Sequence, residues 1–162
     1  QRFSTNTLPE WRLAQPFRAV AHNGEINSVE GNRINVEIKS EAIKSEVFTD
    51  EEMQRILPIL QLNSSDSASA DNFFEFLIVN GMDFFKAARA VIPSAWQNAP
   101  HMDPELRAFY EYNSTVFEAW DGPAAFSVTD GRYIGCVLDR NGLRPSKYII
   151  TKDDNLLIAS EY

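Results

Sequence analysis

The residues best suited to chemistry form one short stretch, His22 to Asn27, which supplies an imidazole, two amides, a glycine and a carboxylate. It follows an apolar run at residues 17–21 that is typical of a buried strand, so the polar groups are expected at a strand end. A side-chain amide beside a backbone N–H is the donor pair that holds a developing oxyanion, and Asn23 with Gly24 offers this pair. The alternative is a polar turn, because Asn-Gly is a frequent turn sequence.

Two further polar stretches, at residues 2–6 and 64–71, interrupt runs that should be structured. Arg2 can bind a carboxylate, because its planar guanidinium group presents parallel N–H donors to the two carboxylate oxygens. Asp66 can receive an ammonium group, and Asn23 can hold a carbonyl oxygen. Together these residues would bind both ends and the side chain of an amino acid that carries an amide. Structural interpretations remain open, with Arg2 as a surface ion pair and Asp66 as a helix cap.

The composition indicates a globular chain and excludes several functions. The 162 residues are 44% apolar and 12% aromatic, with a net charge of −8. An acidic chain without a basic patch is not expected to bind nucleic acid, and no apolar run is long enough to span a membrane. His22 and His101 lie far apart, so no metal site is predicted. Cys136, the only cysteine, excludes an internal disulfide, favours a reducing compartment and is interpreted as a small core residue.

Regular elements must position these residues, and hydrophobic spacing with turn signals predicts where they lie. In the first half they are a strand at 2–7, a helical turn at 11–15, a strand at 17–21, helices at 28–46 and 49–57, a polar loop at 62–71, and helices at 72–79 and 84–92. Ile34 and Ile38 recur at helical spacing, which predicts that they lie on the apolar face of their helix. Thr49 with Glu52 forms a capping box.

The pattern changes at Asp121. Before it, Asp103-Pro104 signals the start of a helix whose apolar face continues to Trp120. After it, strands are expected at 123–129, 132–138, 148–151 and 156–160, with Asp130-Gly131 as a two-residue hairpin turn between the first two. A helical middle followed by a β-meander predicts an α+β fold, with helices layered on antiparallel sheet.

Six segments together resemble one known domain, and they are residues 2–7, 13–18, 22–27, 65–75, 120–125 and 138–146. They are long, occur in the same order and span the chain from end to end. The resemblance is to the glutaminase domain of the glutamate synthase large subunit, a class II glutamine amidotransferase among the N-terminal-nucleophile hydrolases. It implies a four-layer αββα sandwich with antiparallel sheets, which agrees with the α+β prediction. Residues 1–162 would then be one partial domain that lacks the upstream, nucleophile-bearing half.

The resemblance also implies roles for individual residues. The expected catalytic residues are Asn23, through its side-chain amide, and Gly24, through its backbone N–H, which form the oxyanion hole. The expected substrate-binding residues are Arg2 for the α-carboxylate of glutamine, Phe3 and Thr5 as neighbours that line the pocket, and Asp66 and Glu25 for the α-ammonium. His22 is expected to support its loop by hydrogen bonding, and the loop from Asp139 to Pro145 is expected to shape the site or brace the sheet.

The nucleophile of the resembled family is an N-terminal cysteine whose own α-amino group acts as the base. This chain begins with Gln1, and Cys136 cannot take over because it has no free α-amino group. The chain alone is therefore expected to be inactive, whereas the resemblance implies a parent enzyme that hydrolyses glutamine to glutamate and ammonia for reductive transfer to 2-oxoglutarate. The alternatives are a standalone, non-catalytic glutamine-binding module and another class II amidotransferase.

The resemblance assigns cofactors and most partners to regions outside this chain. No cofactor is expected in the chain itself, whereas FMN and an iron–sulfur cluster are expected in other domains of the parent enzyme. The expected partners are glutamine, the remaining domains of the large subunit, and an electron-donating small subunit or ferredoxin. A cytoplasmic location is implied, or the plastid stroma for a plant or alga.

Overall fold

The computed structural model describes residues 10–160. Within this range the elements, in chain order, are a 3-10 turn η1 (Trp11–Leu13), β1 (Val20–Gly24), α1 (Val29–Lys39), a 3-10 turn η2 (Ser40–Ala42), α2 (Asp50–Ile56), α3 (Asp66–Val79), α4 (Phe84–Val91), α5 (Pro104–Val116), β2 (Ala124–Thr129), β3 (Ile134–Leu138), β4 (Lys147–Ile150) and β5 (Leu156–Ala159). Helices combined with small antiparallel sheets confirm the predicted α+β class. The strand predicted at residues 2–7 lies outside the described residues.

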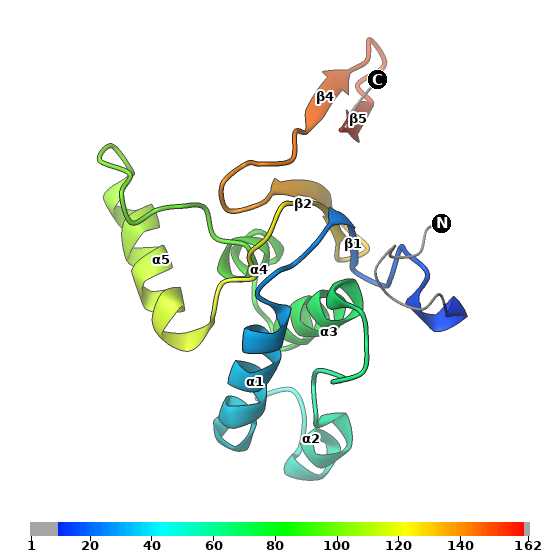
Figure 1. Ribbon diagram of the computed structural model, residues 1–162, viewed down its shortest axis with the longest axis vertical. Helices are drawn as coiled ribbons and strands as arrows, with labels where there is room; N and C mark the ends of the chain where they lie inside the picture. Colours follow the sequence, from blue (N-terminus) through cyan, green and yellow to red (C-terminus); the bar gives the residue numbers. More distant parts are fainter. Residues whose placement is uncertain (1–9, 161–162) are drawn as a thin grey trace.

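The central sheet has the order β1-β2-β3 and is antiparallel throughout, while β4 and β5 pair in a separate hairpin. Its inner face packs on α3 and α4 through the buried side chains of Val20, His22, Phe126 and Val128. Alternate residues, including Ala21 and Ser127, face the opposite side and are less buried. The β4–β5 hairpin stands apart from the rest of the fold (Figure 1), and all its strand residues are exposed.

Helix α3 begins earlier than the sequence pattern predicts. Ser65 caps it by accepting the Ala68 N–H at 3.1 Å, so most of the predicted polar loop is helical. Ser67 and Ser69 are almost fully buried, because their small side chains let this part of the helix lie close to its neighbours. The prediction of a loop at residues 62–71 is therefore wrong from residue 66 onward, where Asp66 starts the helix.

Helix α1 ends earlier than predicted and buries a different face. Ile34 and Ile38 are 55% and 74% exposed, whereas Asn32 and Arg33 are buried. Both polar side chains donate hydrogen bonds to groups remote in sequence, near the start of α3 and in the segment after α5. Such bonds offset the desolvation of a buried polar group. The predicted apolar face and the predicted length of 28–46 are both wrong.

The helix-start signals are confirmed where the sequence carries a local cap. The capping box of Thr49 and Glu52 is formed in full, and Asp83 and Asp103 cap α4 and α5 through their carboxylates. The predicted helical turn after Trp11 is present as η1. Strand β1 is displaced by three residues from its predicted position, so it includes the beginning of the polar motif.

Two predictions about the β-rich end are corrected. The connection between β2 and β3 spans residues 130–133 rather than two residues, because Asp130 Oδ1 accepts the N–H groups of Arg132 and Tyr133 and holds a wider loop. Cys136 is half-buried instead of a core residue. It lies on β3 with its Sγ 3.3 Å from Ser146 Oγ, on the side of the sheet that faces away from α3.

Candidate functional site

The outer edge of β1 is held by side chains. Asp71 lies on α3, and its Oδ1 accepts the backbone N–H groups of Ala19 at 2.8 Å and of Val20 at 2.7 Å. The N–H of His22 donates to Gln15 Oε1 at 2.6 Å, and Gln15 Nε2 reaches Ser67 Oγ on α3 at 3.3 Å. Burial raises the pKa of Asp71 in spite of its hydrogen bonds. Helix α3 therefore fixes β1 directly before the polar motif.

Gly24 is the last residue of β1, and both its backbone conformation and the close packing around it require glycine. Its φ is +133°, which side chains rarely adopt. A Cβ at this position would lie 2.0 Å from the carbonyl oxygen of Pro123. The close approach is part of the sheet, since the Glu25 N–H donates to the same oxygen at 3.2 Å. The predicted need for glycine in this motif is confirmed, and its cause is the contact with the start of β2.

The hydrogen-bond register also determines the direction of the Gly24 N–H. Bonds from Thr129 N–H to Ala19 O and from Glu25 N–H to Pro123 O show that the odd-numbered residues of β1 pair with β2. In an antiparallel pair, the N–H groups of the alternate residues point to the other edge. The N–H groups of Val20 and His22 do so, and the same alternation directs that of Gly24 away from β2.

Asn23 belongs to the set of β1 residues whose side chains face away from α3. It lines a cavity of about 300 Å³ between the sheet, the loop after β3 and the end of β5. Polar residues that share this cavity include Ser127, Cys136, Arg144 and Ser146. An amide side chain that lines the cavity and an N–H directed away from β2 thus belong to consecutive residues at the end of β1.

Asp66 lies at the start of α3 and reaches the turn that follows the motif. Its Oδ2 accepts the Ile26 N–H at 3.0 Å, and its Oδ1 accepts the Ser67 N–H at 2.7 Å. His22 Nε2 lies 3.3 Å from Oδ2. Burial alone would raise the pKa of Asp66, but the His22 contact and the two N–H groups outweigh it and lower the pKa to about 2. The carboxylate is therefore charged at neutral pH.

One buried carboxylate shapes the loop that closes the cavity. Asp139 accepts four backbone N–H groups, those of Ala124, Asn141, Leu143 and Arg144. Burial opposes its ionisation, but these bonds outweigh burial and lower the pKa of Asp139. Because Ala124 starts β2 and Arg144 lines the cavity, the loop braces the sheet and shapes the cavity, as the sequence predicted.

The structure brings Asn23, Gly24 and Asp66 together around the end of β1. Glu25 is exposed at the same turn. The predicted substrate-binding residues Arg2, Phe3 and Thr5 lie outside the described residues. The roles of all seven residues remain predictions.

Sequence reasoning missed the two side chains that hold β1, Gln15 and Asp71. Gln15 precedes a proline in an apparent helical turn, and Asp71 is one of two acids in the predicted loop at residues 62–71. Neither pattern indicates a side chain that bonds to a strand edge. For His22, the expected support by hydrogen bonding comes from its backbone N–H, while both ring nitrogens are buried without a hydrogen bond to the described residues.

No group of three or more His, Cys, Asp or Glu side chains within residues 10–160 is arranged to bind a metal ion. The whole chain has one cysteine, whereas iron–sulfur clusters are held by several thiolates, so the residues present do not fit such a cluster. In the part of the chain that the structure describes, no helix is long and apolar enough to cross a membrane.

Comparison with known proteins assigns the chain to a family, and that family agrees with the α+β fold. The chain belongs to the class II glutamine amidotransferases, whose family pattern matches residues 1–162. Within this class it is similar to a portion of glutamate synthases. It is 49% identical over 160 residues to the glutamate synthase [NADPH] large chain of Bacillus subtilis (strain 168) and 47% identical over 161 residues to the glutamate synthase [NADH] of Schizosaccharomyces pombe.

A ferredoxin-dependent glutamate synthase from Pyropia yezoensis is 45% identical to this chain over 163 residues. Each of the three comparisons covers 99% of this chain but only 8% to 10% of the relative. The chain therefore spans a tenth or less of the length of these relatives. The percentage of identical residues is thus similar for relatives named for NADPH, for NADH and for ferredoxin.

Proposed function

We propose that this chain is the glutamine-binding and oxyanion-stabilising part of a glutaminase domain in a glutamate synthase. The observation that carries the proposal is the end of β1, where the Asn23 side chain lines a cavity and the Gly24 N–H is directed away from β2. Two adjacent, preorganised donors stabilise an oxygen on which negative charge develops. The reaction is hydrolysis of glutamine to glutamate and ammonia, which the parent enzyme uses for reductive transfer to 2-oxoglutarate.

In the proposed reaction, a cysteine thiolate from outside residues 1–162 adds to the side-chain carbonyl carbon of glutamine. The carbonyl oxygen becomes an oxyanion, which Asn23 Nδ2 and the Gly24 N–H hold. The C–N bond then breaks, ammonia leaves with a proton from the nucleophile's own amine, and a γ-glutamyl thioester remains. Water hydrolyses the thioester to glutamate and regenerates the thiol.

The other predicted residues would bind the amino-acid end of glutamine. Asp66, charged at neutral pH, and Glu25 would bind the α-ammonium. Arg2 would bind the α-carboxylate through its guanidinium fork, and Phe3 and Thr5 would line the pocket around it.

We further propose that the chain is one partial domain of a four-layer αββα sandwich. The cavity-lining face of the β1-β2-β3 sheet and the exposed apolar hairpin β4–β5 would face strands contributed by other parts of the polypeptide. FMN and an iron–sulfur cluster would belong to other domains, with a small subunit or ferredoxin as the electron-donating partner. The cytoplasm, or the plastid stroma, is the proposed location.

The 162-residue chain alone is expected to release no ammonia from glutamine, because its one cysteine has no α-amino group to act as the base. The measurement is ammonia release at saturating glutamine, with the full-length parent enzyme as the positive control. Ammonia release that disappears in Cys136→Ser would instead identify Cys136 as a nucleophile and overturn this part of the proposal.

In the full-length parent enzyme, Asp66→Asn is expected to raise the KM for glutamine on the order of tenfold or more, because a charged partner of the ammonium is lost. The rate with ammonia as nitrogen donor should change little, since that reaction bypasses glutamine. Asp50→Asn is the matched control, because Asp50 also begins a helix but is exposed. Equal loss of both activities in Asp66→Asn would mean that the carboxylate is structural.

A further inference from the structure

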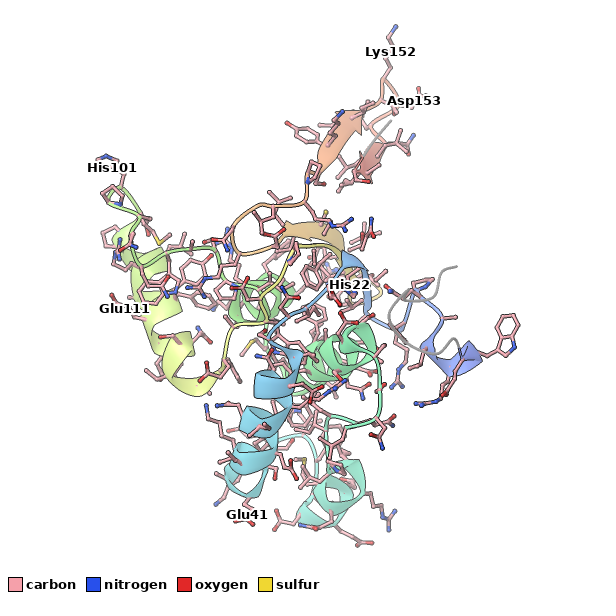
Figure 2. All side chains as sticks on the ribbon, viewed as in Figure 1. His22, Glu41, His101, Glu111, Lys152 and Asp153 are labelled. Atoms are coloured by element: carbon pink, nitrogen blue, oxygen red, sulfur yellow. The ribbon has the colours of Figure 1, made fainter. Side chains whose placement is uncertain are left out.

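His22 is a buried titratable group that the proposed reaction does not use. Its side chain is 2% exposed, and neither ring nitrogen forms a hydrogen bond to the described residues. The ring stacks on Phe126 with centroids 5.5 Å apart and planes inclined by 21°. His22 lies inside the fold where β1 meets α3, whereas the other histidine, His101, lies at the far end beside α5 (Figure 2).

The position of the ring is determined from two sides. The backbone of His22 is tied to Gln15 by a 2.6 Å hydrogen bond, and the ring rests on Phe126. Nε2 therefore faces Asp66 Oδ2 at 3.3 Å without the geometry of a formed hydrogen bond. Hydrogen bonds in such sites are often long or poorly aligned without substrate and tighten only when it is bound.

Asp66 is also tied to the other end of the same motif. Its Oδ2 accepts the N–H of Ile26, so one oxygen contacts the residue before Asn23 and the residue two positions after Gly24. The oxyanion donors therefore lie on a short segment with a hydrogen bond to Asp66 on one side and the 3.3 Å contact between Nε2 and Oδ2 on the other.

We propose that His22 is a positioning residue that sets the distance between the oxyanion donors and the Asp66 carboxylate, and thereby the length of the amino-acid side chain that the site accepts. This inference rests on the proposed function, in which Asp66 binds the ammonium and Asn23 with Gly24 binds the amide oxygen. Glutamine spans that distance, whereas asparagine is shorter by one methylene group.

The test uses the full-length enzyme and the variants His22→Phe and His22→Gln. His22→Phe keeps an aromatic ring beside Phe126 but removes the donor, and it is expected to raise the KM for glutamine about tenfold with little change in kcat. Its preference for glutamine over asparagine, measured as the ratio of kcat/KM values, should fall. His22→Gln restores an amide donor near the position of Nε2 and should recover most of the preference. His101→Asn, at the exposed histidine, is the control and should change neither quantity.

A double-substitution cycle separates this inference from the proposed function. If His22 acts through Asp66, the KM of His22→Phe combined with Asp66→Asn should match that of Asp66→Asn alone. If Asp66→Asn raises the KM but His22→Phe changes neither KM nor preference, the inference about His22 is overturned and the proposed function stands. If Asp66→Asn leaves the KM unchanged, both are overturned.

A merely structural role of His22 predicts a different result. In that case kcat should fall for glutamine and for ammonia alike, the preference ratio should stay constant, and His22→Gln should not differ from His22→Phe. That pattern would overturn the inference. If His22→Phe does not fold, His22→Met takes its place, because methionine adapts to an apolar site and also lacks a donor.

Discussion

Replacing Asn23 with alanine in the full-length enzyme is expected to lower kcat for the glutamine-dependent reaction by about 100-fold to 1,000-fold, the usual effect of removing one oxyanion donor. The KM for glutamine should change much less, because the donor acts mainly on charge that develops in the transition state. The measurement is steady-state glutamine hydrolysis, with the ammonia-dependent rate as a second readout.

Asn63→Ala is the matched control for that substitution, because Asn63 is exposed in the loop before α3. It should leave kcat unchanged. If Asn23→Ala retains a kcat close to that of the unsubstituted enzyme, or loses the ammonia-dependent rate to the same extent, Asn23 does not stabilise the oxyanion.

Gly24→Ala is expected to lower the free energy of unfolding of the 162-residue chain by about 3 kcal/mol or more. The alanine Cβ would lie 2.0 Å from the Pro123 carbonyl oxygen, and φ of +133° is unfavourable for any side chain. Relief requires the start of β2 to move away, which would also break the bond from Glu25 N–H to Pro123 O. The measurement is urea unfolding followed by circular dichroism.

Gly31→Ala is the matched control, because it is the same glycine-to-alanine substitution but is expected to raise the free energy of unfolding instead of lowering it. Gly31 lies in α1 with nothing within 4 Å of an added Cβ, so alanine should raise the free energy of unfolding by about 0.5–1 kcal/mol. Similar values for the two glycine substitutions would contradict the assignment of a close backbone contact at Gly24.

The parts of the fold that sequence predicts correctly are those decided by neighbouring residues. The capping box of Thr49 and Glu52 is formed between residues three apart, and Asp83 and Asp103 act on the N–H groups that follow them. The motif around Gly24 also carries its own signal, because a glycine between polar groups at a strand end marks a close backbone approach.

The errors arise where distant residues decide the outcome. Arg33 is buried with hydrogen bonds to Ser69 on α3 and to the carbonyl of Ser64 just before it, and nothing within α1 indicates these distant partners. Ser67 and Ser69 belong by composition to a loop, yet they form a helix that is packed against the rest of the fold. For the candidate site the same distinction holds, since Asn23 is predicted from its neighbours, whereas the contact of Asp71 with Val20 depends on the tertiary fold.

The bonds that Asp71 and Gln15 make to β1 also bear on self-association. An exposed strand edge is a template on which another molecule can add a strand, which leads to aggregation. Along β1, the N–H groups of Val20 and His22 are already occupied by side chains, so an incoming strand would find no matching row of donors. The next N–H on that edge is that of Gly24, so this edge is closed to a second backbone but suited to a single acceptor atom.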